Sequence, residues 1–290
     1  MRQDLEIQMS AGLAELKKRR AEARFLSYLA PAFASEKQID FWGSPARGRV
    51  IIGANRSGKS HGGAIEVSSW AHYSTIKQPD GTYRTPMGRR IPKGPVFMRV
   101  VCPELPSTLD KEHVQRDKFR LVVPEHWLRG GSFLRAYSVL GHTLHFANGS
   151  LIELMSAEQT ADKHAGQSIH GIWFDEEMPE QIFTENLARL DRDLAAWWFT
   201  YTPVTGLRWI YDKIYLPALR STDPKMWFLR HIDIEDNRRN LGEGFIEYLS
   251  ATLSEDEKSL RLRGQYTVNT GLVFDLFNEG HMIGVEIVVN

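Results

Sequence analysis

The stretch GANRSGKS, at residues 53–60, decides the fold because it has the form G-x-x-x-x-G-K-[ST] of a phosphate-binding P-loop. In such a loop, glycines allow the backbone to turn so tightly that its N–H groups point at phosphate oxygens. The lysine reaches the β- and γ-phosphates, and the last hydroxyl can ligate Mg²⁺. We therefore predict a nucleotide site made of Gly53, Ala54, Asn55, Arg56, Ser57, Gly58, Lys59 and Ser60, with Lys59 in catalysis and Ser60 on the metal.

The flanking residues have the order that the mechanism requires. Residues 49–52 (RVII) indicate a buried strand, and residues 61–67 (HGGAIEV) favour a helix whose positive N-terminal end faces the phosphates. Further apolar runs alternate with helical stretches along the chain. This alternation predicts an α/β fold of the P-loop NTPase type, with a RecA-like, mostly parallel sheet flanked by helices. The further predicted strands are residues 96–101, 171–175, 197–203 and 226–234.

The composition is that of an ordinary globular protein. The 290 residues include 36 basic and 36 acidic side chains, which leaves no net charge to indicate nucleic-acid binding, although a local basic patch would suffice for it. Cys102 is the one cysteine, so no disulfide framework is expected. The sequence has no apolar segment of membrane-spanning length and no signal-peptide core, which favours an intracellular protein without membrane contact.

A second candidate site follows the apolar run 171–174, which ends in three acids. Hydrolysis of ATP needs a carboxylate that holds Mg²⁺ and a base that orients the attacking water. Asp175 suits the first task and Glu176 the second. The alternative is a solvated acidic turn before Pro179, and for Glu177 both assistance and simple exposure stay open.

Three further positions are candidates for nucleotide contact. Arg56 could stabilise charge on the γ-phosphate, or it is a surface arginine. Thr200 and Thr202 could sense that phosphate, or they cap a strand before Pro203. The Gln38 amide could read an adenine edge, or it is a solvated helix residue.

Other segments have weaker signals. The spacing of leucines predicts an amphipathic helix over residues 1–29 with a solvated basic face. Asn148-Gly149 predicts a hairpin between residues 142–147 and 151–155. Residues 242–263 are predicted to be helical. Residues 77–95 suggest a long loop, and its Arg84, Arg89, Arg90 and Lys93 are either a DNA-contacting surface or a solvated insertion. The histidines are taken as structural, with His164 as a possible exception.

Together these motifs resemble the large terminase subunit of tailed bacteriophages, the motor that packages DNA. The resemblance rests on Gln38, on the arginine inside GANRSGKS, on residues 146–177 ending in IWFDEE, and on FTYTPVTG at 199–206. It implies ATP and Mg²⁺ as cofactors, and a Thr200–Thr202 motif that couples hydrolysis to movement. It also implies double-stranded DNA, a small terminase subunit and a portal or procapsid as partners, a homo-oligomeric ring, and a place in the host cytoplasm.

The resemblance further divides the chain into three parts. Residues 1–235 would be the motor domain, 236–265 a helical linker, and 266–290 a short β-rich start of a truncated ribonuclease-H-like nuclease in which only Asp275 matches an acidic position. Such motors also use a basic residue from a neighbouring subunit, and the candidates here are Lys163, Arg189 and Arg192. Two alternatives stay open: a P-loop helicase-type motor, and a nucleotide-gated adaptor for DNA or capsid that does not turn ATP over.

Overall fold

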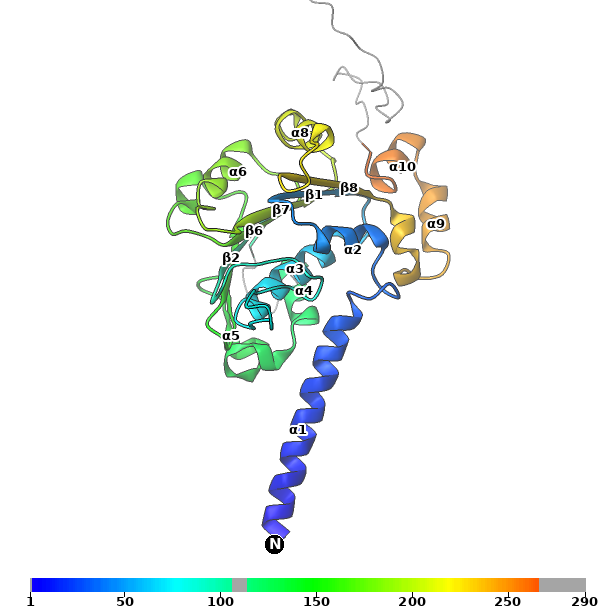
Figure 1. Cartoon of the computed structure of the whole chain (residues 1–290). Helices are drawn as coiled ribbons and strands as arrows, with labels where there is room; N and C mark the ends of the chain where they lie inside the picture. Colours follow the sequence, from blue (N-terminus) through cyan, green and yellow to red (C-terminus); the bar gives the residue numbers. More distant parts are fainter. Residues whose placement is uncertain (1, 106–113, 266–290) are drawn as a thin grey trace, which may run out of the picture.

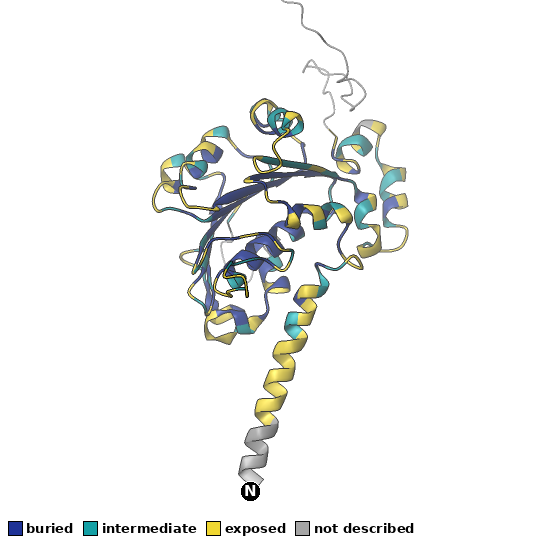
Figure 2. Cartoon of the chain, viewed as in Figure 1, coloured by how far each residue is buried: buried dark blue, intermediate teal, exposed yellow. Residues whose placement is uncertain are grey.

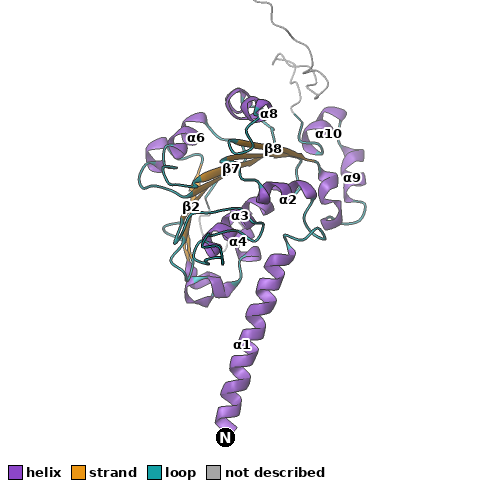
Figure 3. Ribbon diagram, viewed as in Figure 1, coloured by secondary structure: helices purple, strands orange, loops and turns teal. Residues whose placement is uncertain are grey.

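The apolar runs of the sequence form the strands of one sheet in the computed structural model, which describes residues 2–105 and 114–265. The strands found in these residues are β1 (Gly48–Gly53), β2 (Phe97–Cys102), β3 (Tyr137–Ser138), β4 (Thr143–His145), β5 (Leu151–Ser156), β6 (Gly171–Asp175), β7 (Ala196–Tyr201) and β8 (Trp227–Ile232). Their order in the sheet is β3-β4-β5-β2-β6-β7-β1-β8. The sheet runs through the domain with helices on either side of it (Figure 3). All neighbours from β5 to β8 in this order are parallel. β3 pairs with β4 and β4 with β5 in antiparallel fashion, and the β4–β5 pair is the hairpin that Asn148-Gly149 predicts.

Helices cover both faces of the sheet. The α-helices in the described residues are α1 (Arg2–Ser27), α2 (Glu36–Gly43), α3 (Lys59–Tyr73), α4 (Val114–Val122), α5 (Phe133–Ala136), α6 (Glu180–Leu187), α7 (Arg208–Ile210), α8 (Leu216–Arg220), α9 (Phe245–Thr252) and α10 (Glu255–Arg261). The helical turns of 3₁₀ or π type are η1 (Glu125–Trp127), η2 (Arg129–Gly131), η3 (Ala161–His164), η4 (Tyr211–Tyr215) and η5 (Ile234–Asn240). α2, α3 and α4 lie on one face, and α6 and α8 lie on the other (Figure 1). Each face therefore has its own apolar core. The central strands β1, β6 and β7 are fully buried and β2 nearly so, whereas the edge strand β8 is largely half-buried (Figure 2).

A buried ion pair joins β1 to α3 beneath the P-loop. Arg49 Nη1 is 2.7 Å from Glu66 Oε1, and the two side chains are 0% and 1% exposed. The Trp70 indole N–H donates to the same carboxylate oxygen at 2.9 Å. The guanidinium also lies over the rings of Phe41 and Trp198. These contacts fix the strand and the helix that carry the two ends of the P-loop.

The helical segment that follows β8 packs directly on the P-loop. The prediction of helix over residues 242–263 is confirmed by α9 and α10. The Asn55 N–H donates to the Arg261 carbonyl at 2.9 Å. A small apolar cluster is shared between the loop and this segment, formed by Ala54, Ile234, Ile246 and Leu262. Residues 266–290, including Asp275, lie outside the described residues.

The N-terminal helix is confirmed, but its apolar spacing does not mark a buried face along its whole length. α1 projects from the body of the domain (Figures 1 and 2). Phe25 and Leu29, at and just beyond its end, are buried, whereas Leu13 and Leu16 are each 56% exposed. The C-terminal part of the helix reaches the sheet domain, where Glu22 Oε1 lies 3.0 Å from His126 Nε2 and Arg24 Nη2 donates to the Leu121 carbonyl at 3.3 Å.

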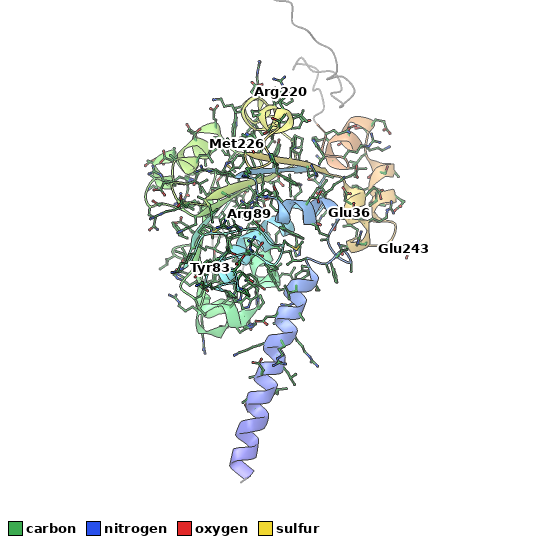
Figure 4. The ribbon with its side chains drawn as sticks, viewed as in Figure 1. Glu36, Tyr83, Arg89, Arg220, Met226 and Glu243 are labelled. Carbon is green, nitrogen blue, oxygen red and sulfur yellow. The ribbon has the colours of Figure 1, made fainter. Side chains whose placement is uncertain are left out.

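The loop of residues 77–95 corrects one expectation. Arg89 is buried and its guanidinium donates to the Ala46 carbonyl at 2.9 Å, inside the body of the domain (Figure 4). The hypothesis that Arg89 contacts DNA is therefore wrong, because the side chain is used to hold the loop against the start of β1. Arg90 and Lys93 remain exposed.

Candidate nucleotide-binding site

The P-loop has the geometry that its sequence predicts. β1 ends at Gly53, α3 begins at Lys59, and the residues between them form the loop. Gly58 has φ +89°, which favours glycine, and it precedes α3 without a side-chain cap. The first N–H groups of α3 are thus left for an anion. Arg56 has φ +63° and an exposed side chain, and its carbonyl accepts a 2.6 Å hydrogen bond from Asn237 Nδ2.

The Lys59 ammonium joins the loop to the acidic strand end. It donates to the Ala54 carbonyl at 3.0 Å and to Thr202 Oγ1 at 2.8 Å, and it lies 3.9 Å from Glu176 Oε1. Burial lowers the pKa of Lys59, and the negative charges of Glu176 and Asp175 oppose that effect. The lysine is therefore held at the mouth of the P-loop by the Ala54 carbonyl and by the side chains that directly follow β7 and β6.

Strand register brings the two threonines to this site. β7 lies between β1 and β6, and Thr200 is level with Ile51 on one side and with Asp175 on the other. Thr200 Oγ1 donates to Asp175 Oδ1 at 2.7 Å, and Thr202 Oγ1 donates to the Gly53 carbonyl at 2.9 Å. Both hydroxyls thus bond across to neighbouring strands, because the carboxyl ends of parallel strands meet at one edge of the sheet.

Asp175 is a buried carboxylate that is 1% exposed. Burial raises its pKa, and hydrogen bonds from Thr200, Gln115 and Ser60 oppose the rise by stabilising the charged form. The hydroxyl of the last P-loop residue and this carboxylate are therefore close together. Hydroxyl and carboxylate oxygens are ligands that suit Mg²⁺, so the donor set fits this ion.

Glu176 is oriented differently from its neighbour. Its φ is +67°, a sparsely populated conformation for a residue other than glycine. Its Oε2 accepts from the Thr202 N–H at 3.0 Å, and its side chain is 36% exposed. Burial raises the pKa of Glu176, with Lys59 opposing. A partly exposed carboxylate with a raised pKa, next to the P-loop, suits a base that orients water.

Glu177 is half-buried and bonds to the loop that follows β7, and whether it assists hydrolysis stays a prediction. Its Oε2 accepts from the Thr205 N–H and hydroxyl, both at 2.6 Å, and its Oε1 accepts from the Leu207 N–H at 3.3 Å. The side chain therefore fixes the loop that follows β7 to the acidic turn that follows β6.

A pocket of about 290 Å³ adjoins the P-loop. Its lining residues come from three stretches of the chain, 28–42, 58–61 and 237–240: Tyr28, Phe33, Ala34, Gln38, Trp42, Gly58, His61, Asn237 and Asn240. The Gln38 side chain is 5% exposed; its Nε2 donates to the Gly58 carbonyl at 3.1 Å and its Oε1 accepts from the Ser35 N–H at 3.0 Å. Gln38 thus lies beside the loop, as a residue that reads a base would, and its contact with adenine stays a prediction.

The remaining basic candidates lie away from the P-loop contacts described above. Lys163 and Arg192 are exposed, and Arg189 pairs with Glu185 on its own helical turn. Whether one of them serves a neighbouring subunit stays a prediction. His164 is fully buried and bonds to the Ser156 carbonyl at 3.1 Å, which fits a structural role.

Sequence reasoning missed Gln115 and the asparagines of η5. Gln115 Nε2 donates to Asp175 Oδ2 at 2.6 Å from α4, although 60 residues separate the two. No motif marks this glutamine, because it stands in a polar stretch with only a general helical character. Asn237 and Asn240 likewise carry no local signal.

The parallel sheet, the P-loop between β1 and α3, and the acids after β6 define this chain as a P-loop NTPase in its fold. Its particular family follows from comparison with known proteins. The family model described as "Terminase large subunit, T4likevirus-type, N-terminal" matches residues 135–280, just over half of the chain. The chain belongs to this family, as the sequence resemblance predicts.

Individual relatives agree with this assignment. The terminase large subunit of Salmonella phage P22 is 25% identical over 258 residues, which cover 80% of this chain and 49% of that protein. The chain thus spans about half the length of this curated relative. The large terminase of the thermophilic bacteriophage D6E has a similar fold, with a TM-score of 0.59 at 18% identity, over 85% of this chain and 57% of that chain. The D6E large terminase in complex with ADP gives a TM-score of 0.54 at 18% identity, over 80% of this chain and 53% of that chain. In the described residues, no helix is both long and apolar enough to cross a bilayer.

Proposed function

We propose that this chain hydrolyses ATP to drive double-stranded viral DNA into a procapsid. The observation that carries the proposal is the meeting of Lys59, Thr202 and Glu176 at the mouth of the P-loop. Lys59 is the first residue of α3, Thr202 directly follows β7 and Glu176 directly follows β6. Together they supply a phosphate-binding cation, a polar link and a base. Membership in the terminase large subunit family supports DNA packaging as the work that hydrolysis drives.

The nucleotide would lie across the P-loop with its base in the adjoining pocket. The phosphates would meet the N–H groups of residues 53–60 and the Lys59 ammonium. The base would enter the 290 Å³ pocket between the Tyr28 and Phe33 side chains and the Asn237 amide. Gln38 uses one of its two amide N–H groups on Gly58, which leaves the other for a base edge. The relative that binds ADP supports a nucleotide of this size.

Ser60 and Asp175 would hold the Mg²⁺ ion that accompanies the phosphates, Asp175 through the water shell of the ion. Bound there, Mg²⁺ supplies positive charge against the phosphate oxygens. Thr200 keeps the Asp175 carboxylate turned toward Ser60 by its 2.7 Å hydrogen bond.

The other residues act on water and on charge. Glu176 would accept a hydrogen bond from the attacking water and orient it toward the γ-phosphate. Arg56, exposed on the loop, would turn its guanidinium to the oxygens of that phosphate. Thr202 bonds both Lys59 and the Gly53 carbonyl, so a change at the phosphates would reach β7 through its hydroxyl.

The proposal extends to the partners of the motor. Residues 1–235 would be the motor, and residues 236–265 would transmit movement because they pack on Ala54 of the P-loop. Duplex DNA, a small terminase subunit and a portal would be the partners of a homo-oligomeric ring in the host cytoplasm. Arg90 and Lys93 are exposed basic side chains available to DNA in this arrangement.

The test is ATP turnover by the purified chain with and without duplex DNA, beside Glu176→Gln. Loss of a positioned base lowers turnover by roughly 10²–10⁴-fold, while ADP binding should stay unchanged. Glu177→Gln is the matched control, because Glu177 holds the loop after β7 and should leave a large share of turnover. Strand separation by the chain would point to a helicase instead. Binding without turnover, with DNA and partners supplied, would point to a nucleotide-gated adaptor.

A further inference from the structure

The metal-side carboxylate is held on both of its oxygens by two different elements. Gln115, in the first turn of α4, is 5% exposed, and its Nε2 lies 2.6 Å from Asp175 Oδ2. Thr200 on β7 donates to Asp175 Oδ1 at 2.7 Å. Each carboxylate oxygen therefore has its own donor, one from the sheet and the other from a helix that no nucleotide motif includes.

The two donors, Gln115 and Thr200, are also connected to each other through packed side chains. Phe119, one turn after Gln115, packs edge-on against the Trp173 ring with centroids 6.2 Å apart at 82°. The Trp173 indole N–H donates to Thr200 Oγ1 at 2.7 Å. The contacts run from Gln115 through Phe119, Trp173 and Thr200 to Asp175, so the seating of α4 and the orientation of the carboxylate depend on each other.

A glutamine is chemically suited to this task. An ionised carboxylate has about four lone-pair directions, and the two donors occupy one on each oxygen. The Ser60 hydroxyl also bonds this carboxylate, so about one lone-pair direction is left for a further ligand, and more if Ser60 turns to the metal. Because the amide is neutral, it fixes the plane of the carboxylate and leaves the full negative charge for a cation. An arginine or lysine in its place would form an ion pair that competes with a metal.

We propose that Gln115 is a positioning residue for the metal-holding carboxylate of this NTPase. It fixes Asp175 in the orientation that a divalent cation needs, so binding of the ion with a nucleotide requires little rearrangement. This inference rests on the proposed assignment of Asp175 to Mg²⁺, and it adds to the site a residue outside the P-loop and the acidic turn.

The test separates metal binding from nucleotide binding in the full chain. ADP affinity is measured by calorimetry with and without Mg²⁺, and Mn²⁺ binding to the ADP complex is measured by electron paramagnetic resonance. Loss of such a supporting hydrogen bond typically weakens metal binding by about 10–100-fold. Gln115→Leu should therefore lower the Mn²⁺ affinity by about 10-fold or more and leave metal-free ADP affinity unchanged. Gln181→Leu makes the same replacement at an exposed position of α6 and should change neither.

A second variant guards against a packing defect. Gln115→Asn keeps an amide but withdraws it by about 1.5 Å, the length of one carbon–carbon bond, so the hydrogen bond to Asp175 is lost with little change in polarity. Both variants should lose metal affinity to a similar degree. Combined with Thr200→Val, the losses should be non-additive, because both donors act on one carboxylate.

Three results would overturn the inference. Unchanged Mn²⁺ affinity in both variants would show that Thr200 alone orients Asp175. A parallel loss of metal-free ADP affinity would show that Gln115 only supports the fold. If ADP binding by the parent chain does not depend on a metal, the role of Asp175 fails and that of Gln115 fails with it. If ADP binding does depend on a metal but DNA never stimulates ATP turnover, the packaging proposal fails while the role of Gln115 stands.

Discussion

Glu66 is the acid on which the buried basic side chains beneath the P-loop depend. Its carboxylate lies 2.7 Å from Arg49 Nη1, and neither side chain is more than 1% exposed. The buried Arg89 is stabilised in its charged form by the same carboxylate. Glu66→Gln keeps the shape of the side chain and an oxygen acceptor for Trp70. It leaves two buried guanidinium groups without their anion.

The expected loss is large. Removing one partner of a buried ion pair costs about 3–5 kcal/mol, because the other charge is left uncompensated in a poorly polarisable environment. A typical domain is stable by only about 5–15 kcal/mol, so the variant should unfold at a clearly lower denaturant concentration. Adding Arg49→Met should recover more than half of the loss, since an apolar side chain of similar length fills the site without a charge.

The assay is urea unfolding monitored by tryptophan fluorescence. A shift of the midpoint reports a change in stability when the dependence of the unfolding free energy on urea concentration, the m-value, stays the same. Glu247→Gln breaks an ion pair with Arg238 in which both partners are at least half exposed, and it should leave the midpoint unchanged. A loss below about 1 kcal/mol in Glu66→Gln would refute the reasoning, since hydrogen bonding rather than charge would then hold the pair. A double variant no more stable than the single one would refute it equally.

Two further predictions concern the edges of the site and the pH dependence of stability. Gly264 has φ +64°, and an added Cβ would lie 2.4 Å from the Gly53 carbonyl carbon, so Gly264→Ala should weaken ADP binding measured by calorimetry. Gly244 has a similar φ with open space around it, so Gly244→Ala should leave ADP binding unchanged. Equal effects of the two substitutions would mean that backbone strain, and not contact with the P-loop, causes the loss of ADP affinity. Burial lowers the pKa of His72 to about 4 from an ordinary 6.5, so the unfolded chain binds more protons between these values, and stability should fall as the pH drops through this window. His72→Phe keeps an aromatic ring stacked on Trp127, where the two ring centroids are 3.7 Å apart. The urea midpoint of this variant should change less between pH 7 and pH 5 than that of the parent chain. An equal change in both would assign the pH dependence to other groups, such as His61.

The sequence was sufficient for the parts of the site that are made by neighbouring residues. A P-loop needs its glycines, lysine and serine in one continuous stretch, so residues 53–60 identify it without any knowledge of distant segments. The same holds for the acids that end β6 and for the turn at Asn148-Gly149. The strand, loop and helix order around these motifs then implied a parallel sheet, and the sheet is observed.

Only the tertiary structure decided which distant side chains complete the site. Gln115 reaches Asp175 because α4 packs beside α3, and Asn237 reaches Arg56 because η5 returns over the P-loop. It also decided that Arg89 is buried and that Glu177 holds a loop. A sequence shows the charge and size of a side chain, but burial and partners depend on strand order and on what covers each face. Contacts across many residues leave no periodic or local pattern, and for that reason this half of the site became visible only in the folded chain.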